Sequence, residues 1–239
     1  MPYMEKRILS GKYLEVEVYP VSVNGKRLPN RRDKEKPSSE AQKKLNDKNA
    51  RKKLARLMNC NFDEVDLFLT LTHKDKDTIT ESEMRNEETN FFRRLKAERE
   101  RRDLPELKYI SVSGKDKKNG IHIHAVVSGD GMTRDEVEAV WSRGRARTSY
   151  LEEDENGFEG LANYFIKNQK QLDTSPNKRK WRQSKNLEKP IVSPPKIVKR
   201  VSAKKEPKPP KGYRLVTYNT AVNDYSGAVY RHVLYKKLE

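Results

Sequence analysis

Residues 120–128 read GIHIHAVVS, and this stretch decides both the expected fold and the expected chemistry. The chain has four histidines, and two of them, His122 and His124, lie one residue apart here in an otherwise apolar run. A run of this kind predicts a buried β-strand. Because side chains at i and i+2 project to the same face of a strand, we expect the two imidazoles side by side, with Ile123 directed into the apolar layer.

This strand is expected to pair with its neighbours in sequence. Residues 107–114, LKYISVSG, predict the preceding strand, and the turn formers of KDKKN predict an antiparallel hairpin between the two. Residues 66–73, DLFLTLTH, predict a further buried strand because they are apolar and β-branched. Residues 13–23, YLEVEVYPVSV, predict a strand by their alternation of apolar and polar positions.

Helices are expected between these strands. One begins after Ser38 or Ser39, and its narrow apolar stripe comprises Ala41, Leu45, Ala50, Leu54 and Leu57. A second runs from about Ser82 to Arg101, with Met84, Phe91, Phe92 and Leu95 inward. Shorter helices are expected over 133–141, capped by Thr133, and over 157–171. The pattern predicts an α+β fold, an antiparallel sheet with helices packed on its face.

The composition points to a polyanionic partner. Of the 239 residues, 36% are charged and 33% are hydrophobic, and the net charge is +17. Such a surplus favours nucleic acid, because each neutralised phosphate releases a condensed counterion. Cys60 is the one cysteine, so no intrachain disulfide is possible and a reducing cytoplasm fits. No apolar run approaches the roughly 20 residues of a membrane span, so we expect no membrane partner.

The composition of the chain changes after residue 171, and residues 172–211, which are rich in Lys, Arg, Ser and Pro, are expected to be extended and mostly irregular. We expect a first domain over residues 1–190, including an N-terminal extension, followed by a basic Pro/Lys-rich segment and a hairpin-like tail over 191–239. The basic part is expected to be mostly irregular and to add salt-dependent affinity for nucleic acid.

Two patterns carry candidate chemistry. Neutral imidazoles on one strand face can share a divalent ion, so His122 and His124 are candidate metal ligands. In LANYFIKNQK, Tyr164 and Lys167 are three residues apart and share a helix face. A tyrosine is a weak nucleophile unless a base, a metal or a cation is near, and Lys167 supplies a cation. Each pattern taken alone also fits ordinary packed histidines or a rim tyrosine beside a solvent-facing lysine.

The order of these motifs in a basic chain resembles the HUH endonuclease superfamily, specifically the rolling-circle replication initiators of bacterial plasmids, phages and integrative elements. The Thr-Leu-Thr strand of LFLTLTH, the His122-Ile123-His124 pair and the Tyr164/Lys167 helix match the three motifs of that superfamily. The resemblance covers roughly residues 40–190 and implies an HUH/RRM-like palm. On this resemblance, residues 1–190 would form an origin-nicking domain, and the protein would act in the cytoplasm of a bacterial cell.

The resemblance implies a DNA nicking–joining endonuclease. His122 and His124 would hold Mg or Mn, Tyr164 would attack the scissile phosphate to form a 5′-phosphotyrosine link, and Lys167 would stabilise the charge. The partners would be single-stranded or hairpin origin DNA, a helicase of the host or element, and a DNA polymerase. The chain has no P-loop pattern, so the helicase is expected to be a separate protein.

Two features of the site stay open in the sequence. The superfamily usually has a third metal ligand, often a Glu on the preceding strand, and YISVSGKDKKNG has none; Asp116 and His73 are the candidates. Trp181 is expected to stack on a base or to pack against the protein, and its cationic neighbours Arg179, Lys180 and Arg182 are expected to hold the DNA backbone.

The sequence leaves three alternative functions open. A non-catalytic origin-binding protein would keep the basic surface without needing Tyr164. A relaxase or transposase of the same superfamily would keep the chemistry, although the order of motifs, histidines before tyrosine, fits initiators and single-tyrosine transposases. An RNA-binding protein with an RRM-like sheet would need the aromatic motif of that domain, which does not occur here.

Overall fold

The computed structural model describes residues 2–21, 40–117, 120–169, 180–198, 201–224 and 226–238. The chain divides into two compact units, each of which is described by itself. The histidine unit comprises Glu40–Asp154 and Phe158–Glu188. The terminal unit comprises Met1–Ser39, Glu155–Gly157 and Lys189–Glu239. The division of the chain by function at residue 190 stays a prediction.

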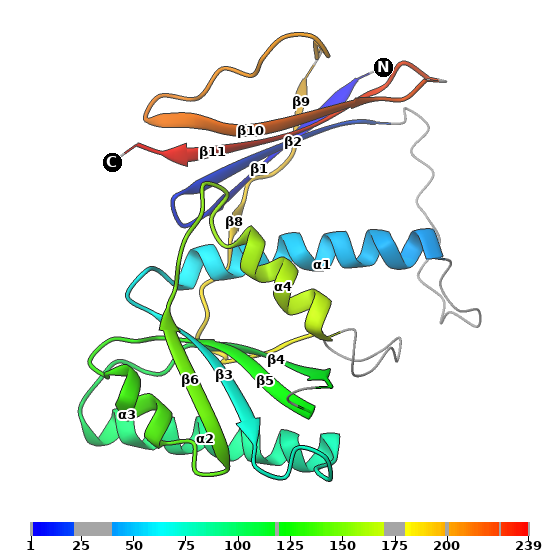
Figure 1. The fold of residues 1–239 in the computed structure, drawn as a ribbon. Helices are drawn as coiled ribbons and strands as arrows, with labels where there is room; N and C mark the ends of the chain where they lie inside the picture. Colours follow the sequence, from blue (N-terminus) through cyan, green and yellow to red (C-terminus); the bar gives the residue numbers. More distant parts are fainter. Residues whose placement is uncertain are drawn as a thin grey trace. The chain divides into compact units, whose positions relative to one another are not determined.

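The histidine unit contains a five-stranded antiparallel sheet in the order β6-β3-β5-β4-β7 (Figure 1). Its strands are β3 (Leu67–His73), β4 (Tyr109–Asp116), β5 (Gly120–Val127), β6 (Gly144–Tyr150) and β7 (Arg182–Gln183). The predicted hairpin is confirmed as β4 and β5, and the predicted buried strand is confirmed as β3. The histidine strand β5 is the central strand of the sheet, so both its edges are paired.

Helices cover both faces of this sheet, and the predicted α+β class is confirmed (Figure 1). On one face, α2 (Glu81–Arg101) and α3 (Arg134–Ala139) pack against apolar side chains of β3 and β5. On the other face, α1 (Glu40–Asn61) and α4 (Glu159–Gln169) pack against side chains of β3, β4 and β5. Since β5 alternates between these two layers, its odd-numbered residues belong to the first core and the histidines face the second layer.

The helix boundaries follow the expected capping chemistry. Thr133 caps α3 as predicted, and Thr80 caps α2, each through a capping box with a glutamate three residues on. All four residues predicted to face inward on α2 are buried. The predicted apolar stripe of α1 is wrong in its N-terminal half: Leu54 and Leu57 are buried, whereas Leu45 is 50% exposed.

The terminal unit is built from strands at both ends of the chain. Its antiparallel sheet has the order β10-β11-β2-β1-β8, and β9 also pairs with β1. The strands are β1 (Tyr3–Ser10), β2 (Tyr13–Pro20), β8 (Ile191–Val192), β9 (Lys196–Val198), β10 (Tyr213–Val222) and β11 (Val229–Lys237). The predicted tail hairpin is confirmed as β10 and β11, while β1 was not predicted.

Among the described residues, no helix combines the length and the apolar character that a membrane crossing needs. Cys60 lies on α1, is partly exposed and forms no disulfide.

Candidate active site

The two histidines of β5 project to the same face of the sheet, as their spacing predicts. His122 is 2% exposed and His124 is 4% exposed. Their ring centroids lie 4.7 Å apart with an interplanar angle of 74°. Ile123 between them is fully buried in the opposite core. The register of the sheet places both imidazoles under the layer that contains α4.

The helix α4 brings a tyrosine to this pair. The Tyr164 hydroxyl lies 2.9 Å from His124 Nε2, and the two ring centroids are 4.9 Å apart. Phe158 and Phe165 are buried against the sheet and anchor the helix there. Tyr164 itself is 41% exposed. Its hydroxyl therefore contacts the buried histidine pair while its ring remains accessible to solvent. The structure therefore joins two motifs that are 40 residues apart in the sequence.

His124 is held on its other side by β3. Thr70 lies opposite His124 in the strand register, and its Oγ1 is 3.1 Å from Nδ1 of the imidazole. Phe68 stacks on the same ring at a centroid distance of 5.6 Å. A hydrogen bond between Nδ1–H and the threonine oxygen leaves Nε2 unprotonated, directed at the tyrosine hydroxyl.

The electrostatics keep His124 neutral. Burial lowers its pKa to about 3, the neighbouring His122 contributes in the same direction, and Asp116 opposes the shift. An imidazole that stays unprotonated near pH 7 can donate its lone pair to a metal ion.

The hydrogen bonds of His122 favour the same tautomer as in His124, with the proton on Nδ1. Its Nδ1 lies 3.1 Å from the Gly120 carbonyl, which accepts a hydrogen bond from Nδ1–H and leaves the Nε2 lone pair available. Gly114 lies opposite His122 on β4, and a Cβ at this position would be 2.8 Å from His122 Nε2. A glycine at position 114 therefore provides the space that this nitrogen occupies. Two adjacent imidazoles can share a divalent cation, and metal binding by this pair stays a prediction.

The two candidates for a third ligand differ in position. Asp116 Oδ2 lies 3.7 Å from His122 Nδ1, with its side chain 40% exposed. His73 follows Thr72, which pairs with His122, so His73 projects to the opposite face of the sheet. Its Nδ1 accepts a hydrogen bond from the Asp75 backbone N–H at 3.1 Å. Of the two candidates, the structure places Asp116 beside the pair and His73 away from it.

Lys167 lies one turn after Tyr164 on α4 and is exposed. Burial raises the pKa of the Tyr164 phenol, Asn168 acts in the opposite direction, and Asp116 raises it further. The phenol is therefore protonated at neutral pH and needs activation before it can act as a nucleophile.

The predicted DNA-contacting cations are mostly engaged within the protein. Lys180 pairs with Asp47, and Arg182 donates to the buried carboxylate of Glu88 at 2.5 Å. The Trp181 indole donates to Gln183 Oε1 at 2.8 Å, and its ring packs at the edge of the α1/α4 core. Arg179 lies outside the described residues. The role of this segment in DNA binding stays a prediction.

The sequence reasoning missed four neighbours of the site. Phe68, Thr70, Gly114 and Asn168 surround the histidines and the tyrosine. The signal for Phe68 and Thr70 was present, because both alternate with the buried leucines of LFLTLTH and so face the histidine side. Asn168, which donates to the Tyr164 carbonyl at 2.9 Å, has no comparable signal in the sequence.

The fold and the site together define an α+β protein in which a helical tyrosine meets a histidine pair on the central strand of an antiparallel sheet. Residues 66–169 match the family model described as replication-associated protein ORF2/G2P. This segment begins just before β3, ends with α4 and contains all three predicted motifs. Over this segment the chain is similar to a replication-associated family, which is consistent with the predicted rolling-circle replication initiator, while the HUH chemistry stays a prediction. No curated protein and no solved structure matched the chain.

Proposed function

We propose that this protein initiates rolling-circle replication by nicking one strand of an origin, with Tyr164 as the nucleophile. The observation that carries the proposal is the 2.9 Å separation between the Tyr164 oxygen and His124 Nε2. A tyrosine that merely filled space at the rim would not need its hydroxyl directed at the buried histidine pair.

A divalent ion, Mg or Mn, is part of the proposal. Nε2 of His122 and of His124 would hold it, and the neutral state of His124 suits ligation. The ion would take the His124 Nε2 lone pair and so replace the hydrogen bond from the Tyr164 hydroxyl. Asp116, whose carboxylate lies 3.7 Å from Nδ1 of His122, is the candidate third ligand. When bound, the ion would polarise the scissile phosphate and draw off developing negative charge. Imidazole ligands favour Mn over Mg, whereas abundance in cells favours Mg.

The phenol supplies the covalent step. Tyr164 Oη would bond to phosphorus as the bond between phosphorus and the 3′ oxygen breaks, which gives a 5′-phosphotyrosine and a free 3′-hydroxyl. The phenol loses its proton to water as it attacks, and the departing 3′ oxygen takes up a proton from water, so the step balances. Lys167 on the same helix face would stabilise the negative charge that develops. A polymerase could extend the 3′-hydroxyl, and a separate helicase would unwind the duplex.

The substrate is proposed to be single-stranded DNA or an extruded hairpin, because a single phosphate must enter the site. The net charge of +17 supports a polyanionic partner. Trp181, with Lys53 Nζ lying 6.0 Å from its ring centroid, is a candidate stacking surface for a base.

The proposal is tested by incubating the protein with Mn²⁺ or Mg²⁺ and a labelled single-stranded origin oligonucleotide, followed by denaturing electrophoresis. A labelled adduct that survives denaturation is expected from the wild type and should be absent from Tyr164→Phe. Tyr150→Phe is the matched control, because Tyr150 is also an exposed tyrosine of the histidine unit, on β6. An adduct that persists in Tyr164→Phe would overturn the assignment, and DNA binding without any adduct would favour a non-catalytic origin-binding protein.

A further inference from the structure

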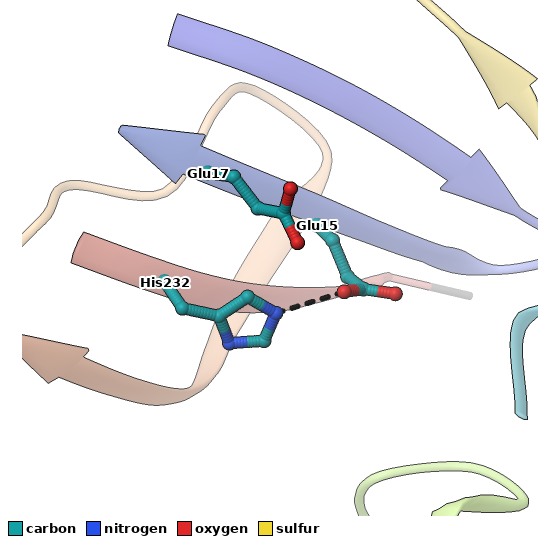
Figure 2. Close-up of side chains that lie close together, drawn as sticks. All are labelled: Glu15, Glu17 and His232. Atoms are coloured by element: carbon teal, nitrogen blue, oxygen red, sulfur yellow. Dashed lines mark hydrogen bonds and ion pairs between the residues drawn. The ribbon is translucent and has the colours of Figure 1, made fainter. Parts of the chain in front are cut away.

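We propose that Glu15, Glu17 and His232 form a second divalent-cation site, in the terminal unit, which takes a transition metal such as Zn²⁺. The three side chains are shown in Figure 2. This inference does not depend on the nicking chemistry, since none of these residues belongs to the histidine unit.

The strand geometry brings the three groups together. Glu15 and Glu17 are two residues apart on β2, so their side chains project to the same face. His232 on β11 lies directly opposite Glu17 in the antiparallel register. One potential ligand atom from each residue lies within 4.8 Å of those from the other two, and His232 Nε2 is 2.8 Å from Glu15 Oε2 (Figure 2). Small side-chain rotations would let all three reach one ion.

The site lies on the face of the sheet opposite the Val16/Val18/Val233/Tyr235 core, and on this second face Glu15 is flanked by the buried side chains of Ile8 and Leu234. The core residues of this unit, Val16, Val18, Val233 and Tyr235, alternate with the three candidate ligands along β2 and β11. Glu15 is only 7% exposed. A carboxylate this far from water needs a cation or hydrogen-bond donors to offset the loss of hydration, and the imidazole already serves this purpose in part.

The ligand chemistry selects the class of ion. Imidazole nitrogen and carboxylate oxygen are both ligands of Zn²⁺, and open zinc sites have three protein ligands with water in the fourth position. Pure oxygen sites suit Mg²⁺ or Ca²⁺, whereas a nitrogen ligand shifts preference toward transition metals. Lys6 is the cross-strand neighbour of Glu17 on β1, so an ion here competes with one ammonium group, and chelation by three residues favours the ion.

The consequence of binding would be structural. Glu15 and His232 are separated by 217 positions in the chain, so an ion between them links the N-terminal hairpin to the C-terminal strand. Because the ligands come together only in the folded sheet, bound metal would stabilise the folded state.

The test is calorimetric titration of the full-length protein with ZnCl₂ in a non-chelating buffer. The His122→Ala/His124→Ala variant is used so that the histidine pair of β5 cannot contribute. We expect one Zn²⁺ to bind per chain, and Glu17→Gln in this background to weaken binding by at least about tenfold. Glu17→Gln keeps the hydrogen bond between His232 and Glu15. The matched control is Glu5→Gln, which changes a glutamate on the opposite face of the same sheet, where it pairs with Arg7.

Two results would overturn the inference: no Zn²⁺ binding in the double-histidine background, or equal affinity in Glu17→Gln and Glu5→Gln. If the double variant does not fold, the same comparison is made in the wild-type background, where Glu17→Gln must lower the number of bound ions by one per chain. Thermal unfolding gives a second readout, since Zn²⁺ should raise the Tm of Glu5→Gln more than that of Glu17→Gln. Loss of DNA-adduct formation bears only on the nicking proposal and leaves this result unchanged.

Discussion

Thr70 determines how His124 presents its ring to the tyrosine. The Thr70 oxygen is 3.1 Å from Nδ1, while Nε2 of the same imidazole faces the Tyr164 hydroxyl. If the hydrogen-bond partner of Nδ1 is removed, neither the tautomer nor the orientation of the imidazole ring is fixed any longer, so Nε2 is no longer held toward the tyrosine. We expect Thr70→Val to reduce adduct formation by about 10- to 100-fold, with the overall fold retained. The measurement is the initial rate of adduct formation at saturating Mn²⁺.

Thr72→Val is the matched control for this prediction. Thr72 lies on the same strand and the same face, but its hydroxyl donates to the Arg145 carbonyl and not to an imidazole. A smaller loss of rate is expected from this variant. If both valine variants lose the same activity, the threonine hydroxyl at position 70 has no special role in positioning His124.

The buried imidazole of His124 should make stability depend on pH. Its pKa in the folded protein is about 3, below the ordinary value of 6.5, so the unfolded chain binds a proton here that the folded chain does not. Stability from this residue is complete above pH 6.5 and is lost as the pH falls from 6.5 toward 3, by at most about 1.4 kcal/mol per pH unit. Urea unfolding in the presence of EDTA should show a shallower pH dependence in His124→Gln. Identical slopes for the two proteins would contradict the lowered pKa.

At the scale of elements, a buried ion pair holds β7 on the edge of the sheet. Glu88 on α2 is 1% exposed, accepts from the Ser111 hydroxyl at 2.5 Å, and accepts from Arg182 at 2.5 Å. Arg182→Leu would leave the Glu88 carboxylate buried with a single hydroxyl donor. We expect the free energy of unfolding to fall by about 3 kcal/mol, measured by urea denaturation.

The double variant Glu88→Gln/Arg182→Leu separates this role from DNA binding. It removes the buried charge together with its partner, so part of the lost stability should return. If instead Arg182→Leu weakens DNA binding and leaves the free energy of unfolding unchanged, the arginine acts on the nucleic acid and the ion pair is not structural.

The elements that could be predicted from sequence are those with strong local patterns. The hairpin of β4 and β5, the strand β3 and the capped helices α2 and α3 all follow from periodicity, turn formers or capping residues. The strand β6, GRARTSY, has no alternation of apolar residues, because it lies on the edge of the sheet and most of its side chains are exposed. The strand conformation of β6 is therefore stabilised by its hydrogen bonds to β3 and not by a local sequence pattern.

At the scale of the whole chain, strands from the two ends depend on each other. In the terminal unit, β2 lies between β1 and β11, and Val16 and Val18 share a core with Val233 and Tyr235. Truncation after residue 190 would leave β1 and β2 as an isolated hairpin, which is at best marginally stable in water. Hydrogen exchange should then show loss of amide protection in residues 3–20, while β5 stays protected. Retained protection in β1 and β2 would contradict their dependence on the C-terminal strands.

Pairing between strands that are distant in the sequence also limits how far the candidate active site and the candidate metal site can be predicted from the sequence. His122, His124 and Tyr164 could be selected from the sequence because their spacing matches ordered motifs on one strand and one helix. Glu15 and His232 could not, because each is unremarkable locally and only the pairing of β2 with β11 brings them together. The ion pairs of Lys180 and Arg182 were missed for the same reason, since their acidic partners lie on α1 and α2.

The identity of the nucleophile is tested most directly by mass spectrometry of the peptide that remains attached to DNA. After reaction with an origin oligonucleotide and digestion with protease and nuclease, we expect a single modified peptide containing LANYFIK, with a nucleotide 5′-phosphate on Tyr164. A nucleotide attached to any other residue, or through its 3′-phosphate, would show that Tyr164 is not the nucleophile.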